Sequence, residues 1–301
     1  MAQMTMPDTT GADGVPPAGP PTGAPDGASG PTPRRRRRTV RRVLIGLGVV
    51  IVLVIGGGAA WWFFGRDQAR PISSDAALQQ FRQSGATGSD GDGRPAIGVY
   101  SAVATGSEDI GIPGLTESYG PGAPVTVTHG DGGCFTYRAD LNNHHWRSWT
   151  FCPASGATFA LTSADTRTVR DVPGLNVDSL TTYTCPTPVP YLWPDPAVGD
   201  TRTGSCTGAS DTITGVTGDA GSVEVLDLGT LTVGGTEVAV VHLRSTDTFT
   251  DAQTGTEVDE WWLDARTGLP LKLVIDADLK SSLGDYIETG TLELTTLTPA
   301  T

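Results

Sequence analysis

The sequence predicts a mainly β protein: an antiparallel curved sheet, half-barrel or sandwich-like, with one short helix and a single transmembrane helix before it. Three observations lead to this fold class. Residues 43–64 form an uncharged apolar run that is long enough to span a bilayer. From Pro95 onward, short segments rich in Val, Thr, Tyr, Phe and Leu alternate with Gly, Pro or Asp. All four cysteines lie in that second part, as is typical of an exported domain.

Residues 1–42 are predicted to be a disordered, Pro/Gly-rich cytoplasmic tail that ends in Arg. They contain too few large apolar groups to offset the entropy lost on folding. The tail carries seven Arg and three Asp, a net charge of +4, whereas residues 65–301 carry a net charge of −17. Because basic residues stay on the cytoplasmic side of a membrane span, we expect the tail inside and the rest of the chain outside. The overall charge of −13 argues against a nucleic-acid binder.

Residues 43–64 are predicted to be the transmembrane helix. At about 1.5 Å per residue the run reaches about 33 Å, which covers a hydrocarbon core of about 30 Å. Residues 61–64, Trp-Trp-Phe-Phe, would form an aromatic belt at the interface. The alternative is a cleaved signal peptide, because residues 43–55 resemble an apolar signal core and residues 58–60 a cleavage site. The long leader and the aromatic end favour the uncleaved anchor.

Residues 65–95 are predicted to be a linker with one short helix. Ser73-Ser74-Asp75 can cap a helix that runs to about Gln83, with Ala77, Leu78 and Phe81 on one face.

Residues 96–301 are predicted to be the exported β-rich domain. Its clearest strand is 269–280, in which apolar and polar residues alternate strictly. The apolar face consists of Leu269, Leu271, Leu273, Ile275, Ala277 and Leu279. Its predicted neighbours are residues 223–233, 236–249, 257–264 and 286–297. Gly234-Gly235 and residues 265–268 are short turns, so the last ~80 residues are expected to form a five-stranded up-and-down meander.

Trp261 and Trp262 are adjacent and therefore point to opposite faces of this sheet. Both faces must then be covered, and three covers are open: a further layer from residues 97–162, the helix near Leu78, or a bound apolar ligand. The two tryptophans are accordingly the candidate ligand-facing residues.

The four cysteines are expected to form two disulfides, Cys134–Cys152 and Cys185–Cys206. Folding residues 134–152 as a hairpin about Asn143 places the first pair opposite each other. The same register pairs Phe135 with Phe151 and Tyr137 with Trp149 on the other face. The second disulfide would then close a Pro-rich loop, residues 186–205.

No catalytic, cofactor-binding or metal-binding residue is predicted, and no enzyme activity is expected. The exported part lacks the common nucleophile, phosphate-loop and zinc-protease motifs. His144 and His145 are interpreted as turn residues at the hairpin tip. The acidic pairs Asp259/Glu260 and Asp276/Asp278 are interpreted as acidic surface. Asp264 is expected to cap its own turn.

Three segments carry a family resemblance: GVYSAVATG, GGCFTYRADLNNHHWRSWTFC and EVDEWWLDARTGLPLKL. Together with the Arg-ended leader and the membrane span, they look like a group of actinobacterial membrane-anchored exported proteins, which implies no catalytic residues. A weaker likeness, limited to the meander and its Trp-Leu-Asp…Thr-Gly-Leu-Pro turn, points to lipid- and lipoprotein-carrier half-barrels of the LolA and LppX type. Those proteins use several helices where this sequence offers one.

These observations predict a single-pass protein of the cell membrane, with the bulk of the chain outside the cytoplasm. Its exported domain is expected to bind an apolar or amphipathic envelope ligand. The alternative is a structural or sensory envelope protein that acts through protein–protein contacts and has no ligand cavity. A deep apolar cavity would favour the first, and a cleft holding titratable residues with perturbed pKa values would favour an enzyme instead.

Overall fold

The computed structural model describes residues 51–52, 54, 69–86, 93–111, 115–172 and 175–301. The chain divides into two compact units, Met1–Gly57 and Gly58–Thr301, and the strands belong to the second. Within the described part of the chain, no helix is long and apolar enough to cross a membrane. The tail expected at residues 1–42 and nearly all of the span expected at residues 43–64 lie outside the described residues.

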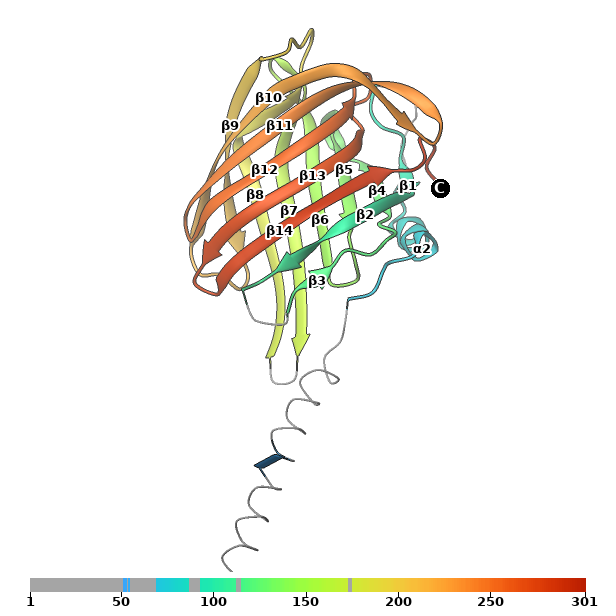
Figure 1. The fold of residues 1–301 in the computed structure, drawn as a ribbon. Helices are drawn as coiled ribbons and strands as arrows, with labels where there is room; N and C mark the ends of the chain where they lie inside the picture. Colours follow the sequence, from blue (N-terminus) through green and yellow to red (C-terminus); the bar gives the residue numbers. More distant parts are fainter. Residues whose placement is uncertain (1–50, 53, 55–68, 87–92, 112–114, 173–174) are drawn as a thin grey trace, which may run out of the picture. The chain divides into compact units, whose positions relative to one another are not determined.

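Among the described residues, fourteen strands form one antiparallel sheet (Figure 1). Each strand from β4 to β13 pairs with the next along the chain, so most of the sheet is an up-and-down meander. The predicted five-stranded meander is confirmed as β10–β14. The strands are β1 (Gly98–Tyr100), β2 (Ala102–Asp109), β3 (Glu117–Ser118), β4 (Val125–His129), β5 (Phe135–Asp140), β6 (His145–Ala154), β7 (Ala157–Val172), β8 (Leu175–Leu192), β9 (Thr201–Ser210), β10 (Val216–Val233), β11 (Thr236–Asp251), β12 (Gln253–Asp264), β13 (Pro270–Ser281) and β14 (Gly284–Leu294).

The sheet is curved, and its two ends meet along residues 98–109. β1 pairs with β4, while β2, which follows after one residue, pairs with β14 and with β3. Strands β10–β14 therefore pass across β5–β8 as a second layer (Figure 1). The layers touch in the interior, where the rings of Trp149 and Trp261 lie 5.1 Å apart. The curved antiparallel sheet agrees with the predicted half-barrel.

The predicted helix is present as α2 (Ser74–Ser84). The Ser73 side chain accepts a hydrogen bond from the Ala76 backbone N–H at 3.2 Å, as an N-cap does. The helix ends at Gly85, whose φ of 66° is in the left-handed region.

Helix α2 packs on the outer surface of β1. Ala77 and Phe81 form a small cluster with Val99, whereas the adjacent Tyr100 belongs to the interior core. Because neighbouring strand residues point to opposite faces, the helix lies outside the curved sheet. The sequence left three possible covers for the predicted meander: a layer from residues 97–162, the helix near Leu78, or a bound ligand. Since the helix lies outside, the layer from the early strands is the one that packs against the inner face of β10–β14.

The interior of the sheet is filled mainly by alternate residues of its strands. In β13, Leu271, Leu273 and Ile275 are buried, as the strict alternation predicted. Asp264 also behaves as predicted, because its carboxylate accepts hydrogen bonds from the Arg266 backbone N–H and from the Thr267 hydroxyl.

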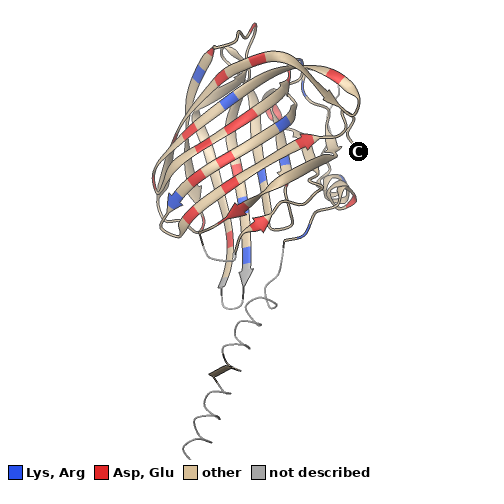
Figure 2. Ribbon diagram, viewed as in Figure 1, with Lys and Arg blue, Asp and Glu red and all other residues tan. Residues whose placement is uncertain are grey.

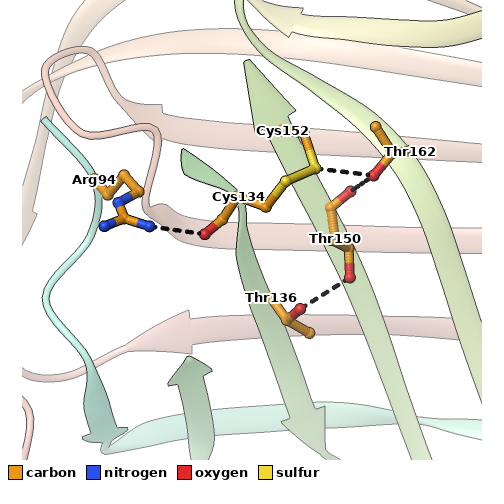
Figure 3. The surroundings of a disulfide bond; sticks show 6 residues. All are labelled: Arg94, Cys134, Thr136, Thr150, Cys152 and Thr162. Carbon is orange, nitrogen blue, oxygen red and sulfur yellow. Dashed lines mark hydrogen bonds between the residues drawn. A yellow bond between two sulfur atoms is a disulfide. The ribbon is translucent and has the colours of Figure 1, made fainter. Parts of the chain in front are cut away.

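The hairpin of β5 and β6 has the predicted register. Phe135 pairs with Phe151 and Tyr137 with Trp149, and all four are buried. The disulfide Cys134–Cys152 joins the two strands, and its neighbours are shown in Figure 3. On the same side, the hydroxyls of Thr136 and Thr150 lie 2.9 Å apart. One register therefore accounts for both the disulfide and the aromatic pairs.

The second disulfide is Cys185–Cys206, also as predicted, but only part of the segment between its cysteines is a loop. β8 continues to Leu192 and β9 begins at Thr201, so the Pro-rich loop expected at residues 186–205 is confined to residues 193–200. The prolines fit in a strand because the register between β8 and β9 shifts between Thr184 and Thr187, which is where the first of them lies.

Candidate functional site

A cavity of about 290 Å³ lies inside the curved sheet, between the two layers. Its apolar wall combines side chains from β6–β9 with side chains from β11 and β13. The cavity reaches the surface at the turn between β13 and β14, because Leu283 lines it and is 56% exposed. The apolar lining consists of Ile110, Trp149, Leu161, Ala164, Val177, Ile213, Phe249, Leu279 and Leu283.

Acidic side chains form the other part of the wall. Asp219, Asp247 and Asp259 come from the successive strands β10, β11 and β12, where acidic residues are concentrated (Figure 2). Asp247 is directly paired with Glu257 on one side and with Gly221 on the other. A Cβ atom at position 221 would lie 2.6 Å from Asp247 Oδ1, so the glycine leaves the room that this carboxylate needs.

Arg147 of β6 reaches these acids from the opposite layer. Its Nη2 donates to Glu257 Oε1 at 2.5 Å, and its Nη1 donates to Glu288 Oε2 at 3.2 Å. The guanidinium also lies 5.2 Å from the Trp149 ring centroid. Both of its terminal nitrogens are thus engaged by glutamates, and neither donates to Asp219, Asp247 or Asp259 in the described structure.

Burial raises the pKa values of the three aspartates. Burial and then the charge of Glu257 raise the pKa of Asp219 to about 7. The pKa of Asp259, which is 2% exposed, is raised by the same two causes in the same order. Burial and then the charge of Asp219 raise the pKa of Asp247. In the described structure, one oxygen each of Asp219 and Asp259 has no hydrogen-bond partner. Each of these carboxyls therefore stays protonated to a higher pH than an ordinary aspartate does, and Asp219 to about pH 7.

A second charged group lies beside the cavity, and in it the pKa values of Glu108 and Glu288 are lowered. Glu117, Glu108 and Glu288 are paired side by side on β3, β2 and β14. Like charges in such positions repel, and cations from the opposite layer neutralise them. His145 lies 2.7 Å from Glu108 and 2.8 Å from Glu288, and Arg170 donates to Glu108.

His145 is the centre of this network. Burial by itself lowers its pKa, but the carboxylates of Glu108 and Glu288 outweigh burial and raise that pKa to about 10. The protonated ring can therefore donate from both nitrogens. The pKa of Glu288 is lowered correspondingly, because Arg147 and His145 together outweigh its burial.

His144 lies in the bend between β5 and β6, as interpreted, but it is buried and its Nδ1 lies 3.1 Å from Glu117 Oε1. The interpretation of His145 as a turn residue was wrong, because His145 is the first residue of β6 and is 1% exposed. Asn143 at the tip is exposed, whereas Asn142 and His144 on either side of it are buried against β3. The Asn142 amide donates to the Ser118 carbonyl, for example.

The interpretation of Asp259 as acidic surface was also wrong, although a signal for its burial was available. Asp259 and Trp261 are two residues apart in a strand and so share a face. Trp261 is fully buried, and the Asp259 side chain therefore also points into the interior. Glu260 points outward with Trp262 and pairs with Arg244 at 2.8 Å.

The two candidate ligand-facing tryptophans lie apart from the cavity lining. Trp261 packs in the core behind Trp149, which does line the cavity, and its indole N–H donates to Ser245. Trp262 is on the outer face, stacked on His242 at 4.0 Å with the Lys272 ammonium 4.9 Å from its ring centroid. The adjacent pair does point to opposite faces, as expected.

Fold and cavity together define a curved antiparallel β domain with an acid-lined interior pocket. No protein-family model, curated protein or solved structure matches the chain. The resemblances to membrane-anchored exported proteins and to lipid-carrier half-barrels therefore stay predictions.

Proposed function

We propose that the domain binds a small amphipathic molecule inside its curved sheet. The observation that carries this proposal is the cavity of about 290 Å³, whose wall is apolar along one part and acidic along another. Ligand pockets of this kind combine apolar surface with a few polar groups that orient the ligand. Filling the apolar part would remove surface from water on both sides, at roughly 25 cal/mol per Å².

The proposal includes the compartment expected from the sequence. Two disulfides are consistent with an oxidising location outside the cytoplasm. An exported domain held at a membrane would meet amphipathic envelope molecules there, and Leu283 at the mouth of the cavity offers an apolar entry point.

Native mass spectrometry of the full chain, purified in lipid nanodiscs rather than in detergent, tests the proposal. We expect an added mass of one small molecule that is released on denaturation. The neutral apolar probe N-phenyl-1-naphthylamine should also bind and gain fluorescence.

Two variants of β7 separate cavity binding from binding elsewhere. Ala164 lines the cavity and is paired with Trp149 on the neighbouring strand β6, whereas Ser163 pairs with Thr150, on the face that carries the first disulfide. Ala164→Phe should weaken probe binding roughly tenfold or more by filling the space, and Ser163→Phe should leave it unchanged. No added mass together with no probe binding by the unaltered chain would refute ligand binding and favour the protein-contact alternative.

A second candidate follows from the raised pKa values of Asp219, Asp247 and Asp259. Carboxyls whose pKa is raised by burial are suited to general acid–base catalysis, so the cavity also fits an enzyme that acts on its occupant. Recovery of a bound molecule in a chemically changed form after incubation would favour this enzyme over a carrier.

A further inference from the structure

The charged groups in the cavity wall are strongly unbalanced. Among the described residues that line it, Arg147 is the one basic side chain. The acidic ones are Asp219, Asp247, Glu257, Asp259 and Asp285. An anionic ligand would thus meet mainly carboxylates, whereas a cationic one would meet opposite charge on three neighbouring strands.

Arg147 is poorly placed to recognise an anion. Its two terminal nitrogens donate to Glu257 and Glu288, so that among the described contacts only Nε has no partner, and a bidentate grip on an anion would require it to leave one of these carboxylates. A buried glutamate left without its partner is costly. The cation of the cavity is therefore already neutralised.

The aspartates have unused hydrogen-bonding capacity on two of the three strands. Asp259 is 2% exposed and lines the cavity, and its Oδ1 has no hydrogen-bond partner among the described residues. Asp219 Oδ1 likewise has no hydrogen-bond partner among these residues. Buried acceptors without partners are uncommon, and each one favours a donor that binds there.

We infer that the polar end of the ligand is an ammonium group, which Asp219, Asp247 and Asp259 hold while the apolar walls hold an attached hydrocarbon. This inference rests on the proposed function and adds the chemical class of the ligand. An ammonium supplies three donors and one positive charge, which matches several carboxylates in one place better than a hydroxyl does.

The raised pKa values of the three aspartates support this assignment. The pKa of Asp219 is raised to about 7, and those of Asp247 and Asp259 are raised as well, so the site takes up positive charge as protons. A bound ammonium would replace them. The other titratable and charged groups that face the three aspartates are Glu257, Arg147, Tyr183 and Tyr191.

Three ten-carbon compounds that differ in their head group test the inference: decylamine, decan-1-ol and decanoate. Isothermal titration calorimetry with the full chain at pH 8 should show decylamine binding roughly tenfold or more tightly than decanol. Decanoate should bind most weakly. The Ala164→Phe variant, prepared in the same way, measures how much of each compound enters any lipid present, and this amount is subtracted.

The variant Asp259→Asn identifies the acids as the cause. It should reduce the preference for decylamine over decanol to less than about threefold while decanol affinity stays the same. Glu260→Gln, next to it on the outer face of the same strand, should keep the full preference. Asp219→Asn is a second test if the first variant folds poorly.

The affinity of the intact chain for decylamine should also rise between pH 5 and pH 8, as Asp219, whose pKa is about 7, loses its proton, while decanol affinity stays constant.

The outcomes separate this inference from the proposed function. Equal binding of the three compounds, or tightest binding of decanoate, would overturn the ammonium assignment and leave ligand binding in place. Binding of none of them, nor of N-phenyl-1-naphthylamine, would refute the proposed function itself.

Discussion

At the scale of single residues, the interior of the sheet contains two groups of carboxyls with opposite pKa shifts. The pKa values of Glu108 and Glu288 are lowered, because His145, Arg147 and Arg170 outweigh the effect of burial. The aspartates of the cavity are buried as well, but the nearby guanidinium is already paired with glutamates. Charge pairing therefore decides the pKa values of the two glutamates, and burial decides those of the cavity aspartates.

The raised pKa of Asp219 predicts how stability depends on pH. Its pKa is about 7 in the folded chain, against an ordinary value of 3.8. The folded chain then binds more protons than the unfolded one between these values, so the free energy of unfolding falls as the pH rises through them. Asp219→Asn should be as stable as the unaltered chain at pH 4 and roughly 1–3 kcal/mol more stable at pH 8.

Urea unfolding at the two pH values measures this difference. Asp276→Asn, at an exposed position of β13, should change stability by less than about 0.5 kcal/mol at either pH. A destabilised Asp219 variant at pH 8 would show that its carboxylate is satisfied in a way that the structure does not contain.

At the scale of elements, the sequence predicted best where alternation and pairing reinforce each other. The hairpin of β5 and β6 has aromatic residues and cysteines that agree on one register, and β13 has strict alternation over its whole length. β8 was partly missed because its prolines argue against a strand unless a register shift is known beforehand. The cavity acids were missed because an acidic residue is usually on the surface, and only contacts with distant strands decide otherwise.

The disulfide of this hairpin should contribute to stability without determining the fold. Cys134 and Cys152 are separated by 18 residues, and a loop of that size stabilises by about 3 kcal/mol in the chain-entropy model. The double variant Cys134→Ser/Cys152→Ser should therefore lose about that amount in urea unfolding and keep its β-sheet circular dichroism. Loss of the sheet signal would show instead that the hairpin cannot form without its disulfide.

At the scale of the whole molecule, the network around His145 connects the two layers where the ends of the sheet meet. His145 and Arg147 belong to β6, whereas Glu108 and Glu288 belong to β2 and β14. The pairing of β2 with β14 places the two glutamates directly opposite each other. Closing the sheet therefore brings two negative charges together. The His145 imidazolium lies between them and offsets their repulsion.

The last prediction concerns this closure. Replacing His145 by Gln removes the cation and leaves two buried carboxylates facing each other, which should cost about 3–5 kcal/mol at pH 7. His242→Gln is the matched control, because His242 is on the outer face beside Glu260 and Trp262, and should cost less than about 1 kcal/mol. The pKa of His145 is about 10 in the folded chain against 6.5 ordinarily, so its contribution is complete below about pH 6.5 and is lost as the pH rises through 10. The gap in unfolding free energy between the unaltered chain and His145→Gln should accordingly narrow from pH 7 to pH 10.5, while the gap for His242→Gln stays small. A His145→Gln gap that does not change with pH would mean that the ring acts by packing alone and that the two glutamates are neutralised in another way.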